Sequence, residues 1–484
     1  MNTQIRRLGI VLAVLFVILF VQLNWLQVID ARHLNEHPGN TRAVVRDFAR
    51  PRGVIQTADG VVIARSDPVD DQFERLRTYP EGELFAHLTG YFSFTYGSDG
   101  VERTYNDALT GRDRKLSIDR LGDLLLEKDQ TANVTLTVSK RLQEIATREL
   151  GARKGAVVAL DPKTGAILAL ADFPSYDTNP LASHDQERVR NTWDALNSDP
   201  DKPLLPRTYR ERYFPGSSFK IVTAATGLAT GVATPTQPVY PVLTELPLPQ
   251  SSQPLGNFGG GRCGGPLPEA LRVSCNTSFG QLGLDLGGDR LSAGAEAFGF
   301  NKVPPHDLPF GVASNFPPGS AFARDRPALA KSAIGQQDVA ATPLQMALVS
   351  AGIANGGTVM TPHVMAEVRD SDGRVIETFN PTPWTTAVSA DVAATTRDMM
   401  VGVVERGSGT RARIPGIRVA GKTGTAQTGL DRSHVWFTAF APADDPRVAV
   451  AVMLEDQPSA DEATGGALAA PIAQTVMRAA LGMA

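Results

Sequence analysis

A serine and a lysine stand three residues apart at the start of an apolar segment, in Tyr213-Phe214-Pro215-Gly216-Ser217-Ser218-Phe219-Lys220. A Pro-Gly turn before an apolar run predicts a turn that opens a buried helix. Ser217 then lies in the first helical turn, and Lys220 shares its face. In a partly dry site near a second cation, Lys220 can lose its proton near neutral pH and activate the Ser217 hydroxyl as a base. About two such pairs arise by chance in a chain of this length, so the hypothesis needs support from elsewhere.

That support comes from two further short motifs, Ser274-Cys275-Asn276 and Lys422-Thr423-Gly424, which follow in order. A second hydroxyl, on Ser274, can relay a proton to a leaving nitrogen. Asn276 can orient both Lys220 and a substrate amide. Lys422 adds positive charge, which depresses the pKa of Lys220 and attracts a substrate carboxylate. Together the three motifs predict acyl transfer through a serine.

The residues around Lys422 extend this prediction. Thr423 and Thr425 can hydrogen-bond a carboxylate, and Gly424 lets a strand lie close to a ligand backbone. The backbone N–H groups of Ser217 and Thr425 are the expected oxyanion hole. An earlier copy, Lys163-Thr164-Gly165, precedes Ser217 and falls in a hairpin turn, so we interpret it as structural.

Apolar strands at the two ends of one domain are expected to position these groups. Residues 155–160 and 166–171 flank a polar turn, 434–441 and 447–454 form a second pair, and 419–427 carry Lys422. Because the arms of the first hairpin are nearly all apolar, the sheet should be covered by helices.

Helices are predicted between and around these strands. They are expected at 140–150, from Ser217 onward, at 268–273 and at 468–481. One more helix is expected to start within 335–345 and to run to about residue 355. Residues 172–213 form a long polar connection, of the sort that can wall a cleft.

The N-terminal segment determines the expected compartment. Arg6 and Arg7 precede an uncharged, apolar run at 8–21, and the apolar character continues to Ile29. This length suffices to span a bilayer, and the arginines place the N-terminus in the cytoplasm. No small-x-small cleavage site follows the run, so an uncleaved anchor is favoured over a signal peptide. The rest of the chain is then expected outside the cytoplasmic membrane.

Length, composition and cysteine content set further bounds. A chain of 484 residues is expected to hold two or three domains, and 42% hydrophobic with 20% charged residues fits a globular protein. The net charge of −4 disfavours a nucleic-acid partner. The only cysteines are Cys263 and Cys275. An oxidising exterior would permit a disulfide between them, beside a candidate site residue, but the sequence leaves this pairing open.

Residues 30–150 are mixed and polar. Two short strands are expected around the Asp59-Gly60 turn, and residues 133–138 alternate as a strand. This region is interpreted as a stalk that holds a catalytic domain away from the membrane.

The three motifs resemble those of the penicillin-recognising serine acyltransferases. The similarity is closest to the class B penicillin-binding proteins and covers nearly the whole chain; its length and composition are similar to an actinobacterial type. The matching segments are the anchor, Arg52-Gly53-Val54-Ile55, Glu102-Arg103-Thr104-Tyr105, Pro215-Gly216-Ser217-Ser218-Phe219-Lys220, Gly335-Gln336 with Thr342-Pro343-Leu344-Gln345, and Gly421-Lys422-Thr423-Gly424-Thr425-Ala426-Gln427.

The resemblance implies an α/β (α+β) transpeptidase domain of the penicillin-binding and serine β-lactamase type, with a central antiparallel sheet and helices on both faces. The expected division is a cytoplasmic end at 1–7, an anchor at 8–29, a stalk at 30–150 and the transpeptidase domain at 151–484. Arg52 and Glu102 are expected to make contacts between the two domains rather than to bind substrate.

The function implied is peptidoglycan D,D-transpeptidation. Ser217 would attack the D-Ala-D-Ala carbonyl of a stem peptide, and the acyl group would pass to an amine on a neighbouring stem. β-Lactams would acylate the same serine. The resemblance implies no metal and no cofactor. It also implies a membrane glycosyltransferase of the RodA/FtsW type as partner.

Rival functions are weighed against this hypothesis. A class A β-lactamase needs a Glu-x-x-Leu-Asn loop after the second motif, and none occurs there. A D,D-carboxypeptidase, in which water replaces the acceptor amine, is poorly separated by sequence. A β-lactam sensor would carry several membrane spans, and an inactive scaffold would be expected to lose a motif.

Overall fold

The computed structural model describes residues 2–25, 48–113, 131–429, 432–458 and 463–483. The described residues fall into two compact units: one holds the N-terminal helix and residues 67–76, and the other holds residues 52–66 and those from 77 onward. Helix α1 (Asn2–Asn24) is long and apolar enough to cross a membrane. The last residues of the predicted anchor, 26–29, lie outside the described residues.

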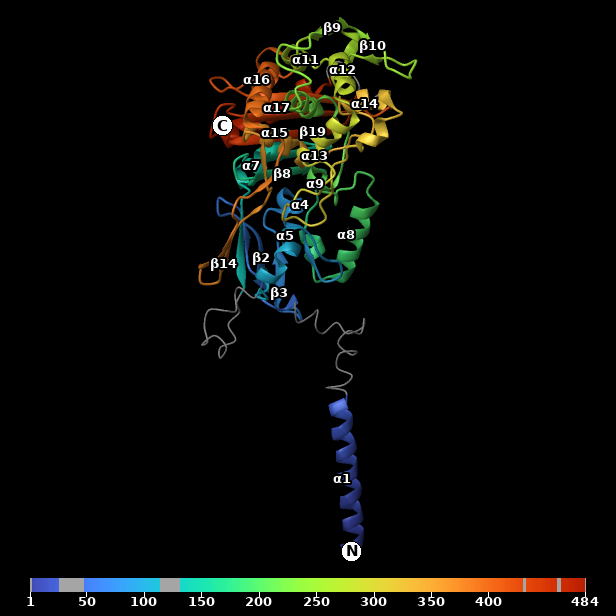
Figure 1. Cartoon of the computed structure of the whole chain (residues 1–484). Coiled ribbons are helices and arrows are strands. Elements are labelled where there is room, and N and C mark those ends of the chain that lie inside the picture. The colour runs from blue at the N-terminus through green and yellow to red at the C-terminus, as the bar shows by residue number, and fades with distance from the viewer. Residues whose placement is uncertain (1, 26–47, 114–130, 430–431, 459–462, 484) are drawn as a thin grey trace. The chain divides into compact units, whose positions relative to one another are not determined.

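Residues 151–484, the predicted catalytic half, are built on a five-stranded antiparallel sheet with strand order β17-β18-β19-β7-β8. Figure 1 labels β8 and β19 of this sheet. Its strands are β7 (Gly155–Leu160), β8 (Ile167–Phe173), β17 (Ala420–Gln427), β18 (Arg432–Ala441) and β19 (Val448–Pro458). They come from the two chain ends of this half, as predicted. The early Lys-Thr-Gly copy lies in the β7–β8 turn, where the Gly165 N–H donates to the Asp161 carbonyl at 2.8 Å.

Both faces of this sheet are buried. Side chains alternate between two hydrophobic clusters, with Val158 and Leu160 in one and Val157 and Ala159 in the other. Helices α10 (Lys220–Ala229) and α15 (Pro343–Ala354) contribute to the first cluster, and α7 (Lys140–Leu150) and α17 (Ala470–Ala480) to the second. The predicted fold class, a central antiparallel sheet with helices on both faces, is therefore confirmed.

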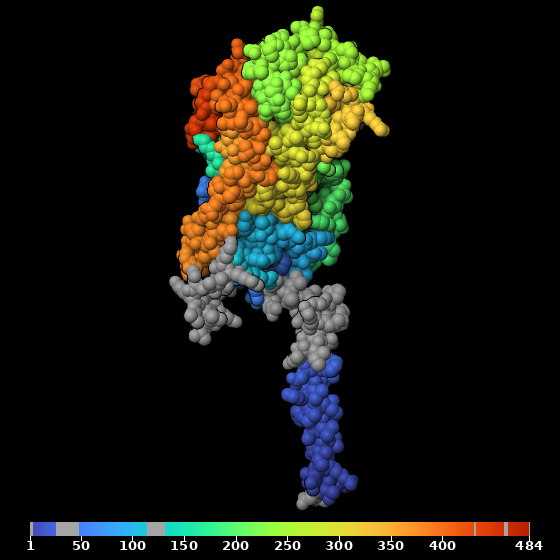
Figure 2. Space-filling view, viewed as in Figure 1, coloured from blue at the N-terminus to red at the C-terminus, as the bar shows by residue number. Residues whose placement is uncertain are grey.

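A second, six-stranded sheet has the order β15-β14-β6-β1-β2-β3. Its strands are β1 (Ile55–Gln56), β2 (Val62–Pro68), β3 (Arg75–Thr78), β6 (Ala132–Leu136), β14 (Met365–Asp370) and β15 (Val375–Thr378). Strand β14 pairs antiparallel with β6, with Val368 opposite Val134. The chain thus returns from its C-terminal half to complete a sheet begun near residue 55. In Figure 2, the orange surface of this returning segment lies beside the cyan surface of the N-terminal half.

Short elements complete the fold. Helices in the N-terminal half are α4 (Ala86–Thr89), α5 (Gly100–Thr104) and α6 (Asn106–Leu109). Helices in the catalytic half are α9 (Arg207–Arg210), α11 (Leu267–Arg272), α12 (Asn276–Leu286), α13 (Gly288–Ala297), α14 (Arg326–Ser332) and α16 (Ala390–Arg406). Four strand pairs are β4 (Phe92–Ser93) with β5 (Gly97–Ser98), β9 (Tyr240–Leu243) with β12 (Cys263–Gly265), β10 (Glu245–Leu246) with β11 (Leu255–Gly256), and β13 (Thr358–Met360) with β16 (Pro383–Thr386).

The polar connection at 172–213 differs from the prediction of a long loop. It contains α8 (Gln186–Ser198), whose only buried residue is Val189. The Asp185 carboxylate caps this helix by accepting the N–H groups of Glu187 and Arg188, at 3.0 and 3.2 Å. Val189, Trp193 and Leu196 follow the i, i+4, i+7 spacing of an amphipathic helix, a signal that the prediction of a loop did not use.

A buried ion cluster corrects the expectation for Arg52 and Glu102. Instead of reaching across to the catalytic half, they bond to each other: Nε of Arg52 donates to Oε2 of Glu102 at 2.7 Å. Nε of Arg77 donates to Oε1 of the same carboxylate at 2.6 Å. Burial alone would raise the pKa of Glu102, but the Arg77 and Arg52 guanidiniums outweigh it and hold that pKa below its usual value.

Candidate active site

Ser217 lies in a 3-10 turn, Gly216–Phe219, that runs directly into α10. Gly216 has φ of +52°, and a Cβ there would lie 2.6 Å from the Thr425 carbonyl oxygen. Glycine is therefore required for the turn to press against β17. The Gly216 N–H also donates to the carbonyl of Gly335 at 2.9 Å, which fixes the turn from its other side.

Lys220 follows in the first turn of α10 and is fully buried. Its Nζ donates to the carbonyl of Ser274 and to Oδ1 of Asn276, both at 2.7 Å. Burial, and then the positive charge of Lys422, lower the pKa of Lys220 well below its ordinary value. Among the described residues no hydrogen bond joins Nζ to the Ser217 hydroxyl, a contact that in such sites often tightens only when substrate is bound.

Ser274 occupies the turn between α11 and α12 and links the two lysines. Its backbone has φ of +61°, a left-handed conformation that is strained for a residue other than glycine. This turn directs its carbonyl to Lys220, while its hydroxyl accepts from Nζ of Lys422 at 2.8 Å and lies 3.4 Å from Nζ of Lys220. One serine therefore bridges both cations.

Lys422 lies on β17, the edge strand of the catalytic sheet, and is fully buried. Its Nζ also donates to the Thr423 carbonyl at 2.9 Å. Burial lowers the pKa of Lys422 to about 7. The site thus holds two buried amines whose pKa values both lie below that of an ordinary lysine.

The remaining residues of β17 frame the site. The Thr423 hydroxyl shares a hydrogen bond of 2.7 Å with the Ser408 hydroxyl, and Thr425 is half-buried. A Cβ on Gly424 would lie 2.7 Å from the Pro215 carbonyl oxygen. The close neighbour that requires glycine at this position is thus the turn that carries Ser217, whereas the sequence argument invoked a ligand backbone.

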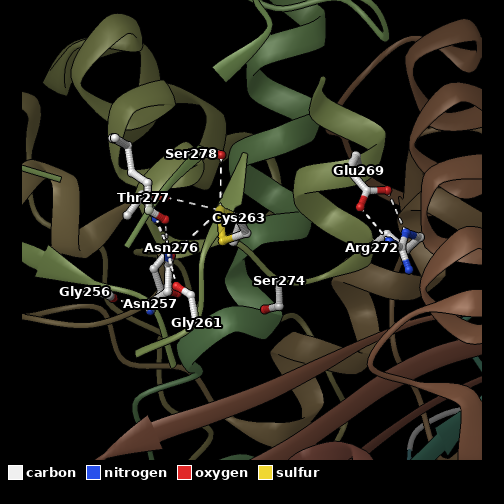
Figure 3. The surroundings of a disulfide bond; sticks show 12 residues. Gly256, Asn257, Gly261, Cys263, Glu269, Arg272, Ser274, Asn276, Thr277 and Ser278 are labelled. Atoms are coloured by element: carbon white, nitrogen blue, oxygen red, sulfur yellow. Dashed lines mark hydrogen bonds and ion pairs between the residues drawn. A yellow bond between two sulfur atoms is a disulfide. The ribbon is translucent and has the colours of Figure 1, made fainter. Parts of the chain in front are cut away.

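Cys263 and Cys275 form a disulfide, with their Cα atoms 5.7 Å apart (Figure 3). It ties β12 to the variable residue of the second motif. Sequence reasoning missed two neighbours in this region: the Gly256 carbonyl accepts from Nδ2 of Asn276, and Oδ1 of Asn257 accepts the N–H of Thr277, both at 3.0 Å. No local pattern marks these contacts, because they join residues 20 positions apart in the chain.

Two family models match the chain. One, described as the penicillin binding protein transpeptidase domain, matches residues 155–478. The other, described as the penicillin binding protein A dimerisation domain, matches residues 52–134.

Relatives align from end to end. The chain is 42% identical to the peptidoglycan D,D-transpeptidase PbpA of Mycolicibacterium smegmatis and to that of Mycobacterium tuberculosis, over 99% of this chain and 99% of each relative. It is similar to solved penicillin-binding protein A from M. tuberculosis as a ceftriaxone acyl-enzyme complex, with a TM-score of 0.84, 41% identity and coverage of 90% of this chain and 100% of that chain. The imipenem acyl-enzyme complex gives a TM-score of 0.83 at the same identity and coverage. With its transpeptidase model, its full-length relatives and its three motifs in one buried site, this chain belongs to the class B penicillin-binding protein transpeptidase family.

Proposed function

We propose that this chain is a peptidoglycan D,D-transpeptidase that works through a Ser217 acyl-enzyme. The observation that carries the proposal is the pair of buried lysines that meet on Ser274, one of them a turn after Ser217. Two lysines this close hold at least one amine neutral near physiological pH, which supplies a base without a histidine. The relatives that align over the full chain are named peptidoglycan D,D-transpeptidases.

The first half-reaction forms the acyl-enzyme. Lys220 takes the hydroxyl proton as Oγ of Ser217 bonds to the carbonyl carbon of the penultimate D-Ala. The carbon–nitrogen bond then breaks, and Ser274 gives its proton to the departing D-Ala nitrogen while taking one from Lys220. Because Nζ of Lys422 donates to Oγ of Ser274, the Ser274 proton is directed away from Lys422 and toward the leaving group.

The second half-reaction transfers the acyl group. The amine of a neighbouring stem peptide attacks the ester carbon, and its proton returns to the Ser217 oxygen by way of Lys220. The proposed oxyanion hole is formed by the N–H groups of Ser217 and Thr425. The first of these lies in the opening turn of a helix, where N–H groups lack helical partners. Lys422, Thr423 and Thr425 are proposed to bind the terminal carboxylate.

Mass spectrometry of the full-length chain after incubation with a penicillin tests this function. We expect one stable adduct on the peptide that contains Ser217, and none in Ser217→Ala. No adduct on a folded wild-type chain would refute the proposal, and turnover of the drug without accumulation would indicate a β-lactamase. Analysis of products with and without an acceptor amine would separate transpeptidation from carboxypeptidation.

The pH dependence of acylation should reflect both lysines. The second-order rate constant is expected to rise on the acid side as Lys220 loses its proton. It should fall from about pH 7 upward as Lys422 loses the charge that attracts the carboxylate. At saturating penicillin the bound carboxylate favours charged Lys422, so the alkaline limb should move to higher pH. Stopped-flow acylation would measure both profiles, and a flat response from about pH 5 to about pH 9 would contradict the assignment.

The membrane arrangement is also a proposal. We assign residues 1–7 to the cytoplasm, 8–29 to a single-pass anchor, 30–150 to the stalk and 151–484 to the transpeptidase domain on the outer side of the cytoplasmic membrane. Helix α1 supports the anchor by length and composition, and Arg6 and Arg7 support the orientation.

A RodA/FtsW-type glycosyltransferase is the proposed partner. The relatives' family and the absence of any glycan-polymerising motif from the sequence support this proposal. Exchange of residues 1–50 for an unrelated anchor should reduce co-purification of the glycosyltransferase. Unchanged recovery would count against a contact through this segment.

A further inference from the structure

Helix α12, which begins at Asn276, takes its cap from another part of the chain. The Cys275 side chain, at the N-cap position, accepts no backbone N–H, and its sulfur is bonded to Cys263. The N–H of Thr277 donates instead to Oδ1 of Asn257 at 3.0 Å (Figure 3). This bond normally comes from a side chain at the N-cap itself. Asn257 therefore substitutes for the missing cap.

The Asn257 amide is held in one orientation. Its Nδ2 donates to the carbonyl of Leu243 at 2.8 Å and to that of Gly261 at 3.0 Å. With both donors used on backbone carbonyls, the amide oxygen must face Thr277. The cap is thus anchored to the antiparallel pair of β9 and β12, the strand pair that carries Cys263.

Gly256, the residue before Asn257, orients the Asn276 side chain. The Gly256 carbonyl accepts from Nδ2 of Asn276 at 3.0 Å, which turns the amide so that its Oδ1 faces Nζ of Lys220 at 2.7 Å. If the amide were reversed, its N–H would bond to the lone pair of neutral Lys220. The backbone at Gly256 therefore keeps the base free to accept a proton.

We infer that Asn257 is a positioning residue for the second motif, which it holds together with the Gly256 carbonyl and the Cys263–Cys275 disulfide. This inference rests on the proposed acyl-transfer function. Neutral Lys220 has two N–H donors, and the backbone carbonyl of Ser274 and the side-chain Oδ1 of Asn276 accept them. Its lone pair is then left for the serine proton. Asn257 acts on the base through the position of Asn276, without touching substrate.

Two substitutions separate capping from loop anchoring. Asn257→Asp keeps an oxygen acceptor for Thr277 and places negative charge at a helix N-terminus, while it loses the two N–H donors to the Leu243 and Gly261 carbonyls. Asn257→Ala loses the acceptor and both donors. We expect the rate constant of the acylation step to fall about 10–100-fold in Asn257→Ala and to stay within about threefold of wild type in Asn257→Asp. The non-covalent affinity for penicillin should change less than this rate constant.

The pH profile gives a readout that a merely structural role would not move. In Asn257→Ala the charged form of Lys220 loses an acceptor, so the acid limb should shift to lower pH. In Asn257→Asp the added negative charge favours charged Lys220, so the acid limb should not shift to lower pH. Asn179→Ala is the matched control, because Asn179 also joins two segments, through bonds of 2.9 and 3.0 Å to the Tyr79 backbone. It should lower thermal stability and leave acylation unchanged.

Stopped-flow acylation of the full-length chain by a fluorescent penicillin, with thermal unfolding in parallel, would test the inference. Equal impairment of Asn257→Asp and Asn257→Ala would overturn it, as would acylation of Asn257→Ala at the wild-type rate. If Asn257→Ala does not fold, an Asn257→Asp chain that folds but acylates about tenfold or more slowly than wild type would overturn it. A wild-type chain that is not acylated would refute the proposed function itself.

Discussion

Lys220→Met is expected to slow acylation by a β-lactam about 10²–10⁴-fold, the usual contribution of a positioned general base. Methionine fills the buried space of the lysine stem but offers no lone pair for the Ser217 proton. Because Lys220 is fully buried and its pKa is lowered well below its ordinary value, its removal also relieves a desolvated amine. The variant should therefore still fold, although the Ser274 carbonyl and Oδ1 of Asn276 lose a donor, and the loss should appear mainly in the chemical step.

Fluorescent-penicillin labelling over time would measure this loss, with circular dichroism to verify the fold. Lys163→Met is the matched control, because it makes the same substitution at a lysine outside the site. Lys163 lies in the β7–β8 turn, is half-exposed and is paired with Asp445 at 2.5 Å. Its labelling rate should equal that of wild type. Labelling of Lys220→Met at near the wild-type rate would mean that another group deprotonates Ser217.

Glu102→Gln is expected to lower the free energy of unfolding by about 3–5 kcal/mol, because it leaves the buried guanidiniums of Arg52 and Arg77 without their shared counter-charge. The substitution preserves shape, so the change measures charge and hydrogen bonding rather than a cavity. Denaturant unfolding of wild type and variant would measure the difference.

The pH dependence of stability offers a second readout. The pKa of Glu102 is lowered in the folded state, so its contribution is fully present above the unfolded pKa and is lost as pH falls through the folded pKa. Glu102→Gln should remove that part of the acid destabilisation. Glu367→Gln, which breaks a partly exposed pair with Arg369, is the matched control and should cost less than about 1 kcal/mol. Equal losses in the two variants would contradict a special role for the buried cluster.

The parts of the fold that sequence could predict are those with a strong local signal. Strand β7 is a continuous apolar run because both of its faces are buried, and α7 has an apolar face that matches its predicted bounds of 140–150. The three motifs indicated a common site because serine acyl transfer needs a nucleophile, a base and a proton relay close together, and because their order resembles that of the penicillin-recognising acyltransferases. The sequence therefore predicted which residues form the site, but not the distances and hydrogen bonds between them.

What could not be predicted depends on partners distant in the chain. The bond from Arg52 to Glu102 spans 50 residues, and the bond from Nδ2 of Asn276 to the Gly256 carbonyl spans 20. The motifs predicted that Asn276 orients Lys220, yet they did not show which backbone group orients Asn276 itself. The same limit concealed the bond by which Asn257 caps α12, since its two residues lie 20 positions apart.

The return of β14 to the N-terminal sheet sets an order on biogenesis. Strand β6 forms its pairs with β14 only after residues 365–370 have been made, more than 200 residues later in translation. Until then β6 presents an unpaired edge that can template aggregation. A fragment that ended before β14 would keep that edge permanently. The N-terminal sheet therefore stays incomplete until most of the chain has been made, and chaperones that shield strand edges would act during that interval.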